Sequence, residues 1–191
     1  MISNKVGHSL DPAILKIYRF FFPHITVNPN YLTLLGTLIG YASALCIAFG
    51  YVKTGGIILI FSGFFDLLDG AIARSTKTVS RFGGFLDSVL DRYTDLFLMF
   101  GIFVFFLRQG HTYALVLTFI AAIGVAIIPY ARARAEAASI ECKSGMLERP
   151  ERIIILLVGI FFNLLLYAVI ALAVLTHITV IQRILFVRKT S

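Results

Sequence analysis

Long apolar runs separated by short polar segments dominate the sequence from residue 30 onward. Four of these runs predict α-helices over residues 30–51, 55–74, 82–106 and 112–137, each close to the ~20 residues that cross a bilayer. The last apolar region, residues 153–187, is too long for a single span. We therefore expect two helices there, with the break at Asn163 and a short fifth helix.

The segment before the first run has a different pattern. Residues 9–22 combine a capping serine, a proline near the first turn and mixed apolar and basic positions, and Pro23 follows. This pattern is typical of an amphipathic helix lying in the membrane interface. The sequence thus predicts an all-α integral membrane protein of one domain, residues 1–191. Residues 1–28 would form the interfacial segment and residues 29–187 a bundle of six transmembrane helices.

Composition agrees with a membrane protein and narrows its ligands. Hydrophobic residues make up 59% of the chain, against roughly 45–50% in soluble domains. The net charge of +7, within such an apolar chain, favours anionic lipid and phosphate ligands over nucleic acid. Cys46 and Cys142 lie in unrelated surroundings without metal-ligand spacing, so we expect reduced thiols.

The basic residues predict the orientation. Six spans place the N-terminus, the polar segments around residues 75–81 and 138–148, and the C-terminus on one side of the membrane. Of the 17 Lys and Arg residues, only Lys53 and Arg108 fall on the other side. Because basic residues concentrate in the cytoplasm, we expect a multi-pass protein of the cell membrane with both termini cytoplasmic.

The most informative stretch runs from Asp66 to Asp91 and follows the pattern D-x2-D-G-x2-A-R-x8-G-x3-D-x3-D. Asp66 and Asp69 share one face of the second predicted helix, and Asp87 and Asp91 share one face of the third. Two helices joined by a short turn can aim these four carboxylates at one point. Oxygen ligands in that number suit Mg²⁺ or Mn²⁺, and two ions fit better than one.

Two other interpretations of these acids agree less well with the sequence. Exposed acids on soluble helices are disfavoured because the flanking residues are far too apolar. A divalent-cation transporter would place acids near the bilayer midplane and show inverted repeats. Here the acids gather toward one side, and no repeat is visible in the sequence.

The stretch resembles the signature of the CDP-alcohol phosphotransferase family, position for position. That family moves a phosphatidyl-type group from a CDP-linked lipid onto an alcohol and releases CMP, a step of phospholipid biosynthesis. The resemblance implies that Asp66, Asp69, Asp87 and Asp91 hold the metal ions. It further implies that Asp91 is the catalytic base and that the protein is a homodimer. The distribution of basic residues, taken separately, predicts an active site on the cytoplasmic side.

The resemblance also implies a nucleotide site. The segment from Asn28 to Thr33, on its own, fits a helix cap with an interfacial anchor as well as a contact with the CDP group; the resemblance favours the second interpretation. Ser80 is equally compatible with a plain turn serine. The expected CDP-lipid-binding residues are Pro29, Asn30, Tyr31, Leu32, Thr33, Gly70, Ala73, Arg74, Ser80 and Gly83.

Two further stretches bear on the acceptor. Residues 130–136 and 148–152 look like the matching segments of the family's inositol-phosphate-using branch, the phosphatidylinositol-phosphate and archaetidylinositol-phosphate synthases. This implies that Arg132, Arg152 and Arg183 hold the acceptor's phosphate, although membrane-flanking charge is the simpler interpretation of basic residues alone. Bacterial members often carry Lys at the first position, and the loop differs in its glycines. Glycerol 3-phosphate is the alternative acceptor, and the lipid can be diacylglycerol- or archaeol-based.

Asp95 continues the four-residue spacing of Asp87 and Asp91. The sequence leaves two roles open for it, as an acid supporting the site or as a partner of Arg92.

Overall fold

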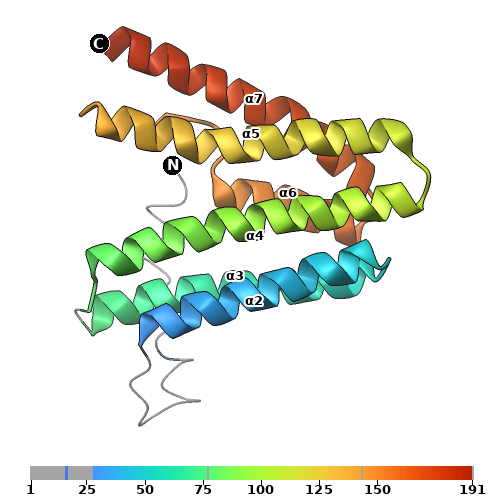
Figure 1. The fold of residues 1–191 in the computed structure, drawn as a ribbon, viewed down its shortest axis with the longest axis horizontal. Coiled ribbons are helices and arrows are strands. Elements are labelled where there is room, and N and C mark those ends of the chain that lie inside the picture. The colour runs from blue at the N-terminus through green and yellow to red at the C-terminus, as the bar shows by residue number, and fades with distance from the viewer. Residues whose placement is uncertain (1–15, 17–27, 77, 143, 191) are drawn as a thin grey trace.

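The fold comes from a computed structural model that describes residues 16, 28–76, 78–142 and 144–190. The amphipathic helix expected at residues 9–22 lies outside the described residues, apart from Lys16. Over the described ranges the chain is all-helical, as expected (Figure 1). The helices are α2 (Pro29–Ala48), α3 (Val52–Ser75), α4 (Arg81–Arg108), α5 (Thr112–Ala137), α6 (Arg149–Phe161) and α7 (Leu165–Thr190).

Turn and capping residues set the helix ends. Asn28 caps α2, since its side chain accepts a hydrogen bond from Asn30 N at 3.0 Å. Gly50 closes the α2–α3 turn and Gly110 the α4–α5 turn, both with positive φ. Asn163, with φ +57°, stands between α6 and α7. The predicted break is therefore confirmed, because Asn tolerates the left-handed conformation that ends a helix.

Helix α2 lies between the two helices that carry the acidic signature. Both α3 and α4 pack closely on α2, and among the described residues they approach each other far less. Small residues on α2 permit this: a Cβ at Gly40 would come within 2.5 Å of Thr94 Cγ2. Ser62 Oγ also donates to Gly36 O at 2.8 Å. As a result α2 sets the distance between α3 and α4.

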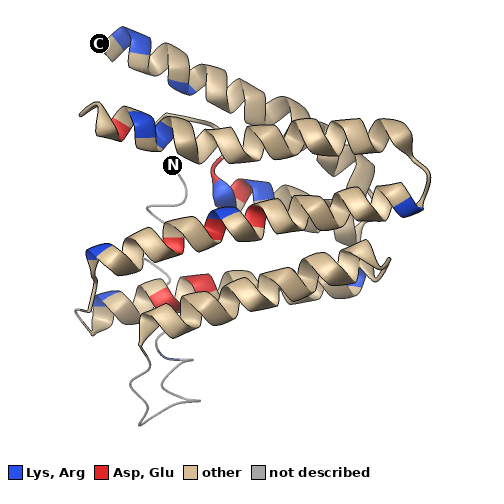
Figure 2. Ribbon diagram, in the orientation of Figure 1, with Lys and Arg blue, Asp and Glu red and all other residues tan. Residues whose placement is uncertain are grey.

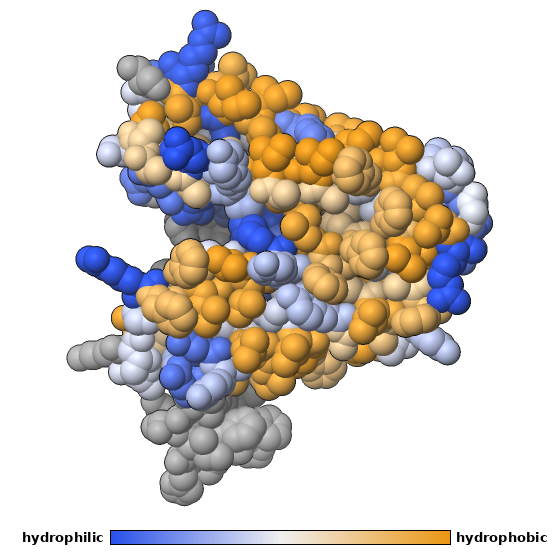
Figure 3. Space-filling view, viewed as in Figure 1, coloured by the Kyte–Doolittle hydropathy of each residue, from blue (hydrophilic) through white to orange (hydrophobic). Residues whose placement is uncertain are grey.

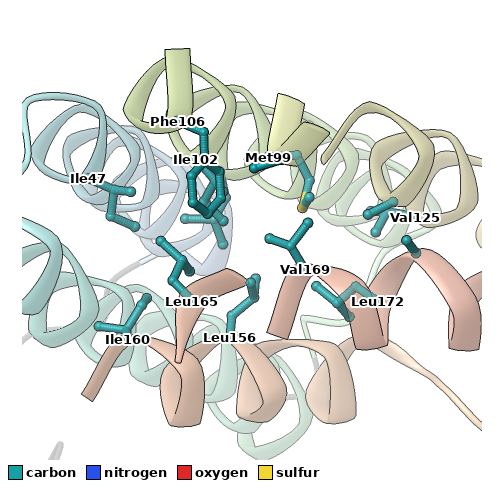
Figure 4. Close-up of a cluster of buried hydrophobic side chains, with 14 of the residues drawn as sticks. Ile47, Met99, Ile102, Phe106, Val125, Leu156, Ile160, Leu165, Val169 and Leu172 are labelled. Atoms are coloured by element: carbon teal, nitrogen blue, oxygen red, sulfur yellow. The ribbon is translucent and has the colours of Figure 1, made fainter. Parts of the chain in front are cut away.

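The second half of the chain is joined to the first through an apolar core. Helix α5 packs on α4 and α7, and α6 packs on α7 and α3. Side chains from α2, α4, α5, α6 and α7 meet in this core and point toward one another (Figure 4). Its members include Ile47, Ile102, Val125, Leu156, Ile160, Val169 and Leu172.

The helices differ in whether their length and apolar composition suit a membrane span. Four of them, α2, α3, α5 and α7, are long and apolar enough to do so. Helix α4 has 28 residues but carries the signature aspartates Asp87 and Asp91 in its first half. Helix α6 has 13 residues, about 20 Å at ~1.5 Å per residue, which is shorter than a bilayer core of ~30 Å. The six-span count therefore stays a prediction.

Polar and apolar surfaces are separated along the long axis. Charged residues of the described helices gather toward the end that holds the α3–α4 turn and the C-terminus of α7 (Figure 2). Lys53, in the first turn of α3, and Arg108, in the last turn of α4, lie at the other ends of these helices. Apolar side chains cover much of the visible surface between the two ends (Figure 3). This asymmetry agrees with the predicted concentration of charge on one side of the membrane.

Candidate active site

The acidic signature occupies the charged half of the bundle. Asp66 and Asp69 lie in the second half of α3, and Asp87 and Asp91 in the first half of α4. The start of α6, with its own charged residues, lies beside α4 (Figure 2). The site is thus assembled from the consecutive helices α3 and α4 and from α6, which is distant from them in sequence.

One pocket, of about 300 Å³, opens between α2, α3 and α4. It contains eight of the ten residues expected to bind the CDP-lipid, together with two signature aspartates. The expected residues are Pro29, Asn30, Thr33, Gly70, Ala73, Arg74, Ser80 and Gly83, and the aspartates are Asp69 and Asp87. The structure therefore brings the α2 entry and the signature to one cavity, as the resemblance implies.

Two expected residues lie elsewhere. Tyr31 is 70% exposed and does not line the pocket. Leu32 is buried in a small apolar cluster with Leu68 and Ile72. Successive helical residues point about 100° apart, so a contiguous segment cannot face one cavity. The pocket also includes Thr78, Val79 and Gly84, which the sequence analysis missed.

Contacts within this pocket fix its geometry. The Thr33 hydroxyl on α2 donates to Asp69 Oδ2 on α3 at 2.5 Å. A Cβ at Gly83 would lie 3.1 Å from Asn30 Oδ1, so the glycine lets α4 meet the start of α2. A Cβ at Gly70 would lie 3.0 Å from the Arg74 guanidinium, which folds back over that position.

Ser80 has a structural role in addition to its place in the pocket. Its hydroxyl accepts a hydrogen bond from Gly83 N at 2.9 Å and caps α4. The interpretation of Ser80 as a turn residue is thus confirmed, and its contact with a ligand stays a prediction.

The four aspartates divide into two pairs. Asp69 and Asp87 line the pocket, and their charges repel each other. Asp66 and Asp91 instead face Arg149 from the start of α6. Arg149 Nη1 lies 2.5 Å from Asp66 Oδ2 and 2.8 Å from Asp91 Oδ1. Over the described ranges, no three acidic, histidine or cysteine side chains form a ready metal cage.

The donor set nevertheless fits divalent cations. All four carboxylates are buried or half-buried, and burying like charges together is unfavourable without a compensating cation. Arg149 supplies that compensation for Asp66 and Asp91. The Thr33 hydroxyl, a neutral group, is the donor to Asp69. Carboxylate oxygens whose negative charge is not fully neutralised by the protein are suitable ligands for Mg²⁺ or Mn²⁺.

A second pocket, of about 160 Å³, lies between α4, α5, α6 and α7. It is lined by Arg132 of α5, Arg152 of α6 and Arg183 of α7, so the three residues expected to hold the acceptor phosphate do meet. Two further arginines, Arg92 and Arg149, also line it. Five guanidinium groups around so small a cavity favour an anionic ligand.

The three expected arginines are held by different partners. Arg183 is 3% exposed and donates to Ser144 O at 3.0 Å and to Ile128 O at 2.6 Å. Arg152 is equally buried, and its Nη2 donates to Asp95 Oδ2 at 2.7 Å. Arg132 is exposed and pairs with Glu136. Two of the three are therefore positioned by buried hydrogen bonds rather than left on the membrane flank.

Arg92, Arg149 and Asp95 form the link between the pockets. Arg92 Nη2 lies 3.5 Å from Asp91 Oδ2, and its buried Nε has no hydrogen-bond partner among the described residues. Asp95 makes ion pairs with Arg149 at 3.4 Å and with Arg152 at 2.7 Å. Of the two roles considered for Asp95, support of the site is the one that these contacts favour.

Comparison with known proteins agrees with this geometry. The family model described as CDP-alcohol phosphatidyltransferase matches residues 26–182. An archaetidylinositol phosphate synthase of Methanothermobacter thermautotrophicus is 40% identical over 97% of this chain and 96% of its own length. A phosphatidylinositol phosphate synthase of Mycobacteroides abscessus is 36% identical over 85% of this chain and 78% of its own.

Solved structures show the same fold. The phosphatidylinositol phosphate synthase of Mycobacterium tuberculosis with CDP-DAG bound superposes with a TM-score of 0.80 at 29% identity, covering 96% of this chain and 94% of that one. The same enzyme in complex with manganese and citrate gives a TM-score of 0.81 at 31% identity, covering 93% and 88%.

Proposed function

The chain belongs to the CDP-alcohol phosphatidyltransferase family, and we propose that it transfers a phosphatidyl-type group from a CDP-linked lipid to inositol phosphate. One observation supports this most directly: two of the signature aspartates, Asp69 and Asp87, line the first pocket, and the other two, Asp66 and Asp91, contact Arg149, which lines the second. The first pocket contains most of the residues expected to bind the CDP-lipid, and the second is lined by five arginines. A donor and an anionic acceptor can therefore meet at the acids.

The first pocket suits the nucleotide end of the donor. Asn30 supplies an amide and Arg74 a guanidinium, both able to bind base or phosphate oxygens. The missing side chains of Gly70 and Gly83 leave room for the Arg74 guanidinium and the Asn30 amide at this pocket. A solved neighbour binds CDP-DAG. Among the curated relatives both diacylglycerol- and archaeol-type names occur, so the donor here is CDP-diacylglycerol or CDP-archaeol.

The carboxylates of Asp66, Asp69, Asp87 and Asp91 would hold divalent metal, Mg²⁺ or Mn²⁺, in two sites. When bound, such ions neutralise the diphosphate and the charge that develops on the departing CMP. Thr33 orients Asp69 for this task through its hydroxyl. One solved neighbour contains manganese.

The second pocket would hold the acceptor by its phosphate. A dianionic phosphate can accept charge-assisted hydrogen bonds from several guanidinium groups at once. Hydrogen bonds fix the Arg152 and Arg183 side chains at this pocket. Arg132 is exposed and pairs with Glu136, so it can reorient toward a bound phosphate. The relatives named for inositol phosphate products support inositol phosphate over glycerol 3-phosphate.

The chemical step itself needs one proton acceptor. The acceptor hydroxyl oxygen forms a bond to the lipid-side phosphorus of the donor, and the phosphorus–oxygen bond to CMP breaks. Asp91 takes the hydroxyl proton, because it is the signature acid whose neighbours Arg92 and Arg149 both line the acceptor pocket. CMP leaves with the electron pair of the broken bond.

The setting follows from charge and family. We place the enzyme in the cell membrane as a multi-pass homodimer of six-span protomers, with its active site in the cytoplasm, acting in phospholipid biosynthesis. The concentration of charge at one end of the bundle supports this orientation (Figure 2). The membership in a transferase family argues against the alternative of a cation transporter.

An acceptor screen tests the proposal. Purified protein would be given CDP-diacylglycerol or CDP-archaeol, Mg²⁺ or Mn²⁺, and inositol phosphate, glycerol 3-phosphate or free inositol, and CMP would be followed. We expect CMP release to be fastest with inositol phosphate. Equal rates with free inositol would contradict the arginine pocket, and a preference for glycerol 3-phosphate would correct the acceptor.

A further inference from the structure

Arg149 occupies a position that the mechanism does not explain. Its guanidinium lies between Asp66 and Asp91, two of the carboxylates proposed to bind metal. Arg149 therefore occupies carboxylate oxygens that a metal ion bound at these aspartates would need.

The same side chain also reaches the acceptor side. Arg149 Nε lies 3.4 Å from Asp95 Oδ1, and Arg149 lines the arginine pocket. Its three ion pairs use two atoms: Nη1 contacts both Asp66 and Asp91, and Nε contacts Asp95. A rotation of the guanidinium can therefore release the first two carboxylates while the Asp95 contact is kept.

From this geometry we propose that Arg149 is an internal counter-cation that exchanges with divalent metal. Without metal, its guanidinium neutralises Asp66 and Asp91. Metal binding displaces it toward Asp95 and the arginine pocket, where it adds a donor for the acceptor phosphate. The inference rests on the proposed metal site and deepens it, because it couples metal binding to acceptor binding through one side chain.

Electrostatics give the expected sign. A cation that binds the metal ligands competes with the metal, so removing it should strengthen metal binding. Loss of a single charge-assisted contact changes affinity by about tenfold or more. Arg149→Gln should therefore bind Mn²⁺ on the order of tenfold more tightly than wild type. If Arg149 only held the site together, its removal would instead weaken metal binding, because the carboxylates would no longer be positioned.

Isothermal titration of Mn²⁺ into the metal-stripped full-length protein measures this directly, without turnover. Arg149→Lys keeps the charge and should return the affinity toward that of wild type. Arg132→Gln is the matched control, because Arg132 lines the same pocket but pairs with Glu136, away from the metal ligands. The rise in melting temperature caused by Mn²⁺ should be larger for Arg149→Gln than for wild type, since tighter binding gives a larger stabilisation.

A double-mutant cycle provides a second test. Asp95→Asn leaves Arg149 to Asp66 and Asp91 alone and should weaken Mn²⁺ binding. In the Arg149→Gln background the same Asp95 change should have little effect. Unchanged or weaker Mn²⁺ binding by a folded Arg149→Gln protein overturns the inference, as does an Asp95→Asn effect that persists without Arg149. A wild type that binds no Mn²⁺ overturns the metal site itself.

Discussion

The hydroxyl of Thr33 on α2 lies 2.5 Å from Asp69 Oδ2 on α3, and it is the only hydroxyl donor to a signature aspartate among the contacts of the described residues. Asp69 is 6% exposed, so this hydrogen bond replaces water that burial has removed. Helix α2, which carries no signature acid, thereby takes part in building the acidic site.

We expect Thr33→Val to reduce kcat/KM for the CDP-lipid by about ten- to a hundredfold, since a hydrogen bond to a charged group contributes ~1.5–3 kcal/mol. Thr33→Ser should retain most activity. Thr37→Val is the control, because Thr37 is equally buried on α2 but donates to the Thr33 carbonyl. Full activity in Thr33→Val would contradict a role for this contact.

The metal ligands give the second prediction. Replacing Asp66, Asp69 or Asp87 by Asn removes a charge and conserves shape, so each variant should lose turnover and bind Mn²⁺ more weakly. Asp91→Asn should also be inactive but should bind the CDP-lipid more nearly like wild type, because Asp91 acts mainly as the base. Turnover and Mn²⁺ titration measure the two effects. Normal turnover in any of these variants would refute the site.

The arginine pocket gives the third. Arg152→Gln should weaken acceptor binding by one to two decades, at ~1.4 kcal/mol per decade, and should leave CDP-lipid binding nearly unchanged. Arg134→Gln is the control, since Arg134 is exposed in the last turn of α5 and does not line the pocket. Acceptor saturation at fixed CDP-lipid is the measurement. Similar behaviour of both variants would mean that these arginines serve only as membrane-flanking charge.

The fourth concerns the packing of α2. A Cβ at Gly40 would lie 2.5 Å from Thr94 Cγ2, so in Gly40→Ala the Thr94 side chain or α4 itself must shift. We expect a loss of ~1–3 kcal/mol in unfolding free energy, as for other overpacked sites, together with weaker Mn²⁺ binding. Gly63→Ala on α3 has open space around it and should be neutral or stabilising. Thermal unfolding distinguishes the two, and equal melting temperatures would argue against the tight contact.

Orientation gives the fifth. In a protein with Cys46 and Cys142 replaced by Ser, Lys189→Cys should react with an impermeant thiol reagent only from the cytoplasmic face. Lys53→Cys should react only from the outside, because Lys53 lies in the first turn of α3, at the end of that helix away from the signature aspartates. Labelling of both positions from the same face would exclude the six-span arrangement.

Local sequence signals were sufficient for the helices and for much of the site. Proline, glycine and asparagine mark the helix ends because they act through their own backbone preferences, as at Asn163. The signature spacing placed its acids on single helical faces, and the pocket includes most of the residues expected from it.

Long-range contacts were beyond such signals. Arg149 reaches Asp66 across 83 positions of sequence, and no periodicity reports such a pair. A place for Arg92 in the site could have been suspected, because it directly follows Asp91, the last residue of the signature. Tyr31 was included because it belongs to a contiguous segment, whereas a helix turns it away from the cavity. The division of the aspartates into two pairs also depends on α2 and α6, which the signature does not contain.

The packing of α3 and α4 on α2 has one more consequence. The space between the two halves of the signature is wide enough for a pocket because α3 and α4 both pack on a third helix, α2. Gly36 and Gly40 determine how closely each acidic helix approaches α2, because they have no side chains. Substitutions at these two glycines, which line neither pocket, can therefore change substrate selectivity in this enzyme.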